Sequence, residues 1–124
     1  MRRIALMVFR LFFKAFYYFY HICKCASRDD ISYEEGFRWI KRTTILANRA
    51  GRVKIDAHGM ENLPEKDGFI MFPNHQGLFD VLVFLESCPR PFAFVIKKEA
   101  ANIILLKQVR EALGSLVMDR EDVF

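Results

Sequence analysis

His75 and Asp80 have the residue types and the spacing of a general base and the carboxylate that supports it. An imidazole with an unperturbed pKa near neutrality accepts a proton from a hydroxyl group at physiological pH. A carboxylate on one ring nitrogen fixes the tautomer and stabilises the charge that develops on the ring. A plainer alternative stays open, in which Asp80 caps a helix and His75 is a surface residue.

Two predicted elements would bring this pair together. The apolar run at residues 69–72 predicts a buried strand that ends at Pro73, because proline has no N–H to give to a sheet. Apolar residues recur from Leu78 onward and predict a helix. His75 would then lie at the carboxyl end of a strand, where open α/β sheets bind ligands, with Asp80 in the first helical turn.

Three sequence blocks carry a family resemblance. They are Asn74-His75 with Asp80, residues 95–99 (Val-Ile-Lys-Lys-Glu) and residues 113–120 (Leu-Gly-Ser-Leu-Val-Met-Asp-Arg), preceded by a lead-in at residues 58–64. Together they resemble the glycerolipid acyltransferase family and, within it, the 1-acylglycerol-3-phosphate acyltransferases. The family's later Glu-Gly-Thr-Arg block and proline-containing block have no counterpart before Phe124. The resemblance therefore predicts the front half of an acyltransferase domain.

The resemblance implies a reaction. His75 would remove the proton from the free hydroxyl of a lysophosphatidate, and that oxygen would attack an acyl thioester carried on coenzyme A or acyl carrier protein, forming phosphatidate. Asp80 would orient the imidazole. No cofactor or metal is expected. No covalent intermediate is expected either, since Ser115 lies outside a Gly-x-Ser-x-Gly elbow and Cys88 has no evident base partner.

The acceptor's phosphate requires cations, and the resemblance nominates Arg120, with Lys97 and Lys98 as second candidates. Asn74 and Gly114 complete the predicted substrate-binding set. A guanidinium fits phosphate oxygens as a planar fork, which an ammonium does not. A surface ion pair between Arg120 and a neighbouring carboxylate is the alternative.

Charge is distributed unevenly along the 124 residues, which carry a net charge of +4. Residues 1–54 hold 12 Lys/Arg and 4 Asp/Glu, whereas residues 55–124 hold 7 and 11. The basic residues of the first half are interleaved with long aliphatic and aromatic runs. Nucleic acid is therefore a poor partner for this half, and anionic membrane lipids fit better. A content of 52% hydrophobic residues excludes a disordered chain.

Residues 4–22 predict an amphipathic helix with one polar stripe, formed by Arg3, Arg10, Lys14, Tyr17 and His21. A spanning helix would place Arg10 and Lys14 near the bilayer centre, at about 2.5 to 3.5 kcal/mol each. We therefore favour a helix lying in the interface, at the cytoplasmic face of the cell membrane. A signal peptide and a helix packed in a soluble core are the competing interpretations.

His21, Cys23 and Cys25 lie close enough in sequence to suggest a metal site. Cys-x-Cys is tighter than the usual zinc spacing and no second pair follows, so no metal is predicted. With Cys88 the cysteine count is odd, which favours reduced thiols in a cytoplasmic setting.

The remaining pattern predicts an α/β fold. A second, basic helix should run from about Tyr33 to Ala50, and turn residues occupy positions 62–68. Strands are expected at residues 53–57, 92–96 and 115–118, and a helix at 99–113. The predicted organisation is a two-helix membrane-associating motif at residues 1–52, followed by an incomplete acyltransferase domain at residues 53–124.

Two classes of function stay open, an acyltransferase and a non-catalytic membrane-associated remnant of the family. Within the first class, glycerol 3-phosphate or another lysophospholipid could replace lysophosphatidate as the acceptor. A reading frame that continues past Phe124 with a Glu-Gly-Thr-Arg block would favour the enzyme. We expect the 124 residues alone to bind membranes or aggregate without acyl transfer, because residues 115–118 would form an apolar sheet edge and the later block is missing.

Overall fold

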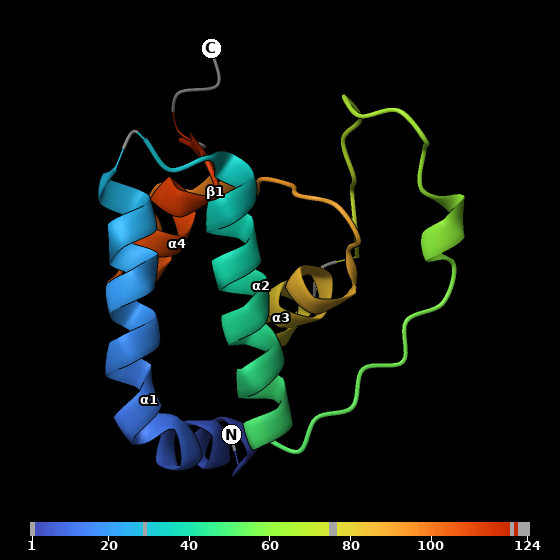
Figure 1. The fold of residues 1–124 in the computed structure, drawn as a ribbon. Helices are drawn as coiled ribbons and strands as arrows, with labels where there is room; N and C mark the ends of the chain where they lie inside the picture. The colour runs from blue at the N-terminus through green and yellow to red at the C-terminus, as the bar shows by residue number, and fades with distance from the viewer. Residues whose placement is uncertain (1, 29, 75–76, 120, 122–124) are drawn as a thin grey trace.

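The computed structural model describes residues 2–28, 30–74, 77–119 and 121, and it shows a mixed, mainly helical fold with one small parallel sheet (Figure 1). In chain order, the elements of the described residues are α1 (Arg2–Ser27), α2 (Tyr33–Ala50), the 3-10 helix η1 (Met60–Asn62), α3 (Leu78–Ser87), β1 (Val95–Lys97), α4 (Leu106–Ala112) and β2 (Leu116–Met118).

Helices α1 and α2 confirm the two helices predicted for the N-terminal half. Ser32 begins α2 as its N-cap, since its hydroxyl accepts the Glu35 N–H at 3.3 Å. The first turns of α1 run beneath the C-terminal end of α2, and the helix then bends and continues beside α2 (Figure 1). Met7 in these first turns is buried against Gly51.

Two arginines of α1 donate hydrogen bonds to carbonyl oxygens at the C-terminal end of α2. Arg3 Nη1 donates to the carbonyl oxygens of Gly51 and Arg52, both at 3.1 Å, and Arg10 Nη1 donates to that of Ala50 at 3.2 Å. The last carbonyls of a helix have no intrahelical donor and carry the negative end of the helix dipole. Two of the five residues of the predicted polar stripe therefore have a structural role at the end of α2.

The core lies where four helices meet. Its buried residues are Ile22 of α1, Phe37 and Ile40 of α2, Leu85 of α3, and Ala112 and Leu113 at the end of α4. Helices α2 and α4 approach closely because Gly36 has no side chain: a Cβ there would lie 2.5 Å from the Ala112 carbonyl oxygen. The core thus includes residues on both sides of position 52, the predicted domain boundary.

The sheet is a β–α–β unit in which β1 and β2 pair in parallel, with Val95 opposite Leu116 and Lys97 opposite Met118. The Phe94 N–H extends the pairing by donating to Ser115 Oγ at 3.1 Å. The strand predicted at residues 115–118 is confirmed, and the one predicted at 92–96 begins only at Val95.

The helix predicted at residues 99–113 is shorter than expected. Residues 98–105 form turns, and Leu105 has a φ of +74°, which a helix does not accommodate. Helix α4 therefore begins at Leu106. Only the second half of the segment with the apolar period therefore forms a helix.

The strands predicted at residues 53–57 and 69–72 are wrong. Both segments are unpaired in an extended arm (Figure 1), and the second is not buried: Ile70 is 76% exposed and Phe72 91%. A strand needs backbone partners, and the sheet in the described part of the chain consists of β1 and β2 alone. An apolar, β-rich composition supplies no such partner.

No described helix combines the length and the apolarity that crossing a bilayer requires.

Candidate active site

Asp80 lies in the first turn of α3, as predicted, and it also caps that helix. Its Oδ2 accepts the Gly77 N–H at 3.0 Å, while the Asp80 N–H donates to the Gly77 carbonyl at 3.1 Å. The side chain is half-buried. These bonds fix one carboxylate oxygen within a few residues of the predicted base. His75 itself lies outside the described residues, so its pairing with Asp80 stays a prediction.

Two of the candidate phosphate ligands, Lys97 and Lys98, lie at the carboxyl end of the sheet. Lys97 ends β1, and Lys98 follows it and donates its N–H to the Met118 carbonyl of β2 at 3.1 Å. Gly114 leads into β2 with a φ of +59°, a conformation that favours glycine. Asn74 is exposed at the end of the extended arm. Arg120 lies outside the described residues.

Lys98 is engaged by an acidic neighbour. Its Nζ lies 2.6 Å from Asp119 Oδ2. This hydrogen bond raises the pKa of Lys98, and together with the Glu121 N–H it lowers the pKa of Asp119. A phosphate bound by Lys98 would have to share the ammonium with Asp119, whereas Lys97 makes no ion pair with any described residue. Lys97 is therefore the better second candidate.

The family of the chain follows from comparison with known proteins. A family model described as Acyltransferase matches residues 54–123, more than half of the chain. The chain belongs to the acyltransferase family. It is 28% identical over 71 residues to a 1-acyl-sn-glycerol-3-phosphate acyltransferase of Borreliella burgdorferi, a match covering 57% of this chain and 28% of that protein. The chain thus spans under a third of the length of this relative. No solved structure matches the chain.

Arg90 is a residue that the sequence analysis did not single out. It follows α3 and holds the arm that leads to the predicted base: its guanidinium donates to the carbonyls of Pro64 at 2.5 Å and Glu65 at 3.0 Å and to Asp67 Oδ1 at 3.0 Å. It also lies 5.6 Å from the centre of the Phe69 ring. The sequence feature that could have drawn attention to Arg90 is its position between Pro89 and Pro91.

The suspected metal ligands have other surroundings. His21 stacks on Trp39, with ring centres 4.1 Å apart, and Cys25 packs against the core, where burial raises the pKa of its thiol. Among the described residues, no group of three His, Cys, Asp or Glu side chains is placed to hold a metal ion.

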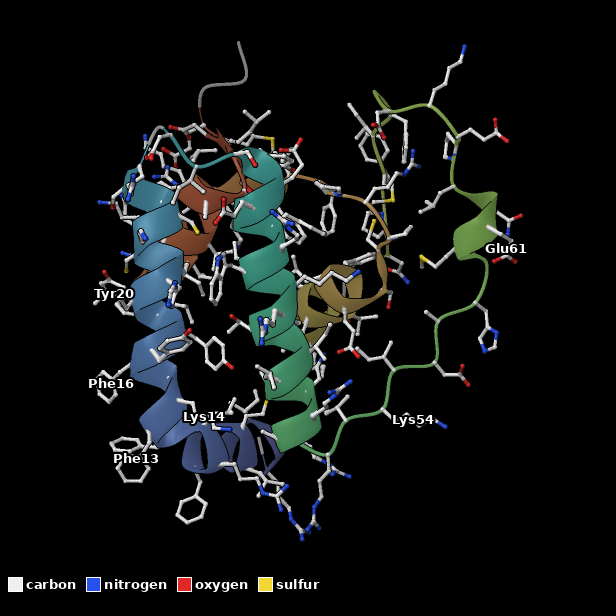
Figure 2. All side chains as sticks on the ribbon, in the orientation of Figure 1. Phe13, Lys14, Phe16, Tyr20, Lys54 and Glu61 are labelled. Atoms are coloured by element: carbon white, nitrogen blue, oxygen red, sulfur yellow. The ribbon has the colours of Figure 1, made fainter. Side chains whose placement is uncertain are left out.

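The apolar face of α1 is exposed. Three residues of the polar stripe of α1 contact the α2 side, Arg3 and Arg10 through carbonyl oxygens and His21 by stacking on Trp39. Phe13, Phe16 and Tyr20 point away from α2 (Figure 2). The large hydrophobic residues exposed on α1 are Ile4, Val8, Phe9, Phe12, Phe13, Phe16, Tyr17 and Tyr20.

Proposed function

We propose that this acyltransferase transfers an acyl group from a thioester to the free hydroxyl of 1-acylglycerol-3-phosphate. The observation that carries the proposal is the family match over residues 54–123, which includes the whole Asn74-to-Asp80 block. The name of the Borreliella burgdorferi relative supports this acceptor. The position of Asp80 in the first turn of α3 suits a carboxylate that orients a nearby imidazole.

In this mechanism, His75 removes the hydroxyl proton as the acceptor oxygen attacks the thioester carbonyl carbon. The carbon–sulfur bond then breaks, and the thiolate of coenzyme A or acyl carrier protein leaves and takes the proton back from the imidazolium. Asp80 holds the imidazole while it carries the charge. Lys97 and Arg120 bind the acceptor's phosphate, with Lys98 and Asn74 beside them and Gly114 shaping the turn before β2.

The test is acyl transfer from a radiolabelled acyl thioester to 1-acylglycerol-3-phosphate, using protein made from the complete reading frame that contains these residues. His75→Ala should lower kcat by at least ~100-fold and change KM little, because a general base acts in the transition state. His58→Ala is the matched control, since His58 is an exposed histidine that contacts Asp56 in the arm. We expect this control to keep its activity.

Asp80→Asn separates the two roles of Asp80. The amide oxygen still accepts the Gly77 N–H, so α3 keeps its cap, but the amide no longer supports an imidazolium. A kcat loss close to that of His75→Ala, with unchanged thermal stability, would support the pair. Turnover near the parent value in His75→Ala would refute the mechanism.

We also propose that α1 docks this acyltransferase on a membrane. Its apolar face is exposed over most of its length, and Phe13 is 89% exposed. Burying such aromatic side chains at a lipid interface removes apolar area from water, at roughly 25 cal/mol per Å². The basic residues beside this face would remain at the level of the headgroups.

Sedimentation with lipid vesicles tests the docking. Phe13→Ser/Phe16→Ser should reduce binding to both neutral and anionic vesicles by about tenfold or more, because two large apolar contacts are lost. Phe69→Ser/Phe72→Ser is the matched control, since it removes two exposed phenylalanines from the arm. Equal losses in the two double variants would show that α1 is not the docking face.

A further inference from the structure

A basic groove of about 400 Å³ lies along α2 and is closed at one side by Tyr18 of α1. Three arginines of α2 line it, namely Arg38, Arg42 and Arg49, and all three are exposed. Ile45 and Leu46 provide apolar lining between them. None of the residues predicted for catalysis belongs to this groove, so acyl transfer does not account for its charge.

The three arginines make no ion pair within the described part of the chain. Other cations of the helix pair are engaged: Arg3 and Arg10 bind carbonyls at the end of α2, and Lys41 of the groove donates to the Cys88 carbonyl at 2.5 Å. Arg38 and Arg42 are four residues apart on one helix, a spacing at which like charges repel. A bound anion would relieve this repulsion.

The chemistry of the groove favours a phosphate with an apolar attachment. Guanidinium groups bind phosphate oxygens through paired hydrogen bonds, and a phosphomonoester offers three terminal oxygens and a charge near −2 at neutral pH. A phosphodiester carries less charge than a phosphomonoester, and its second ester bond leaves fewer terminal oxygens for the guanidinium groups to bind. Tyr18, Ile45 and Leu46 would contact the glycerol and the first carbons of the acyl chains.

We propose that this groove binds the phosphomonoester headgroup of a phosphatidate-type lipid in the membrane on which α1 docks. The groove and the docking face share the helix α1: Tyr18 lines the groove on the side toward α2, and Phe16 and Tyr20 are exposed on the opposite side. The inference rests on the membrane association proposed above, because a membrane has to bring the lipid to the groove.

The experiment compares vesicles that contain phosphatidate with vesicles that contain phosphatidylglycerol, matched for surface charge. The parent protein should bind the phosphatidate vesicles about tenfold more tightly, since the fork geometry of arginine adds to the general attraction of charge. Arg38→Gln/Arg42→Gln should reduce this preference to less than about twofold. Arg38→Lys/Arg42→Lys keeps the charge without the fork and should retain only part of it.

Lys54→Gln/Lys66→Gln is the charge-matched control. Both lysines lie in the arm, and Lys54 points away from the helix pair (Figure 2). This variant should keep the full preference for phosphatidate. If both double glutamine variants weaken binding to the two vesicle types equally, the groove acts only through general charge attraction and the proposal is overturned.

Two further outcomes separate this site from its alternatives. If millimolar inorganic phosphate abolishes the preference, the groove is a site for free phosphate, which contradicts a lipid ligand. If Phe13→Ser/Phe16→Ser leaves vesicle binding intact while the arginine variants lose the preference, the docking face is wrong and the groove stands. Circular dichroism and urea unfolding confirm that each variant remains folded.

Discussion

The helix pair α1–α2 and the extended arm at residues 53–74 are both rich in apolar residues, yet they have opposite structures. The pair contributes Ile22, Phe37 and Ile40 to the core, and its ends are capped by Ser32 and by the arginines of α1. The arm is unpaired, and its Phe72 is 91% exposed. A helix satisfies its own backbone, whereas an extended segment depends on a neighbour.

The difference also concerns how each region is held. The helix pair is stabilised by buried apolar area shared among four helices. The arm has polar contacts with Arg90, a residue outside it, which binds Pro64, Glu65 and Asp67. The region that leads to the predicted base contributes no side chain to the core cluster of the described residues.

The largest effect is expected in the core. Leu113 is fully buried, so Leu113→Ala should lower the free energy of unfolding by about 2 to 5 kcal/mol through lost contacts and a residual cavity. Phe72→Ala removes a larger side chain from the arm and should change it by less than about 0.5 kcal/mol. Urea unfolding measures both. Similar losses for the two variants would show that Phe72 is buried in solution.

The close approach of α2 and α4 gives the next largest effect. Gly36→Ala improves helix propensity by up to about 1 kcal/mol, but the new methyl group would meet the Ala112 carbonyl at 2.5 Å. Overpacking of this kind costs about 1 to 3 kcal/mol, so we expect net destabilisation in the same urea assay. A stabilised Gly36→Ala variant would mean that the two helices lie further apart.

A smaller, local effect is expected in the arm. Arg90→Gln removes the ion pair with Asp67 and most of the donors that hold residues 64–69, so limited proteolysis should cut the arm several-fold faster. Global stability should fall by at most about 1 kcal/mol, since these contacts are exposed. Lys66→Gln is the control in the same loop. An unchanged cleavage rate in Arg90→Gln would show that the contacts of Arg90 do not restrain the arm.

The smallest effect concerns the ion pair at the end of the sheet. The Lys98 ammonium lowers the pKa of Asp119, so the pair contributes stability above the usual carboxyl pKa and loses it as the pH falls through the lowered value. At the alkaline end, the contribution of Lys98 is lost as the pH rises through its own raised pKa.

Titration of the Asp119 carboxyl resonance by NMR measures this shift directly. Lys98→Gln should raise the midpoint toward the ordinary carboxyl value, while Lys97→Gln should leave it nearly unchanged because Lys97 does not contact Asp119. An identical midpoint in the parent and in Lys98→Gln would show that the ion pair does not persist in solution.

Sequence reasoning succeeded for elements whose signals are local. The periods of α1, α2 and α3 and the first-turn position of Asp80 were predictable, because a helix repeats its contacts within four residues. It failed for residues 53–57 and 69–72, where apolar composition indicated strands without naming the strands they would pair with. The hold of Arg90 on residues more than 20 positions away was likewise beyond any local pattern.

The polar stripe of α1 shows what the sequence predicts about a helix and what it leaves to the tertiary structure. The sequence by itself determined that Arg3, Arg10 and His21 share one side of a helix, because that follows from about 100° of rotation per residue. Only the tertiary structure decided that this side faces α2, because the carbonyls at Ala50 and Gly51 and the ring of Trp39 belong to another helix. Periodicity defines the two faces of a helix, and the partner that covers one of them is a matter of contacts between distant residues.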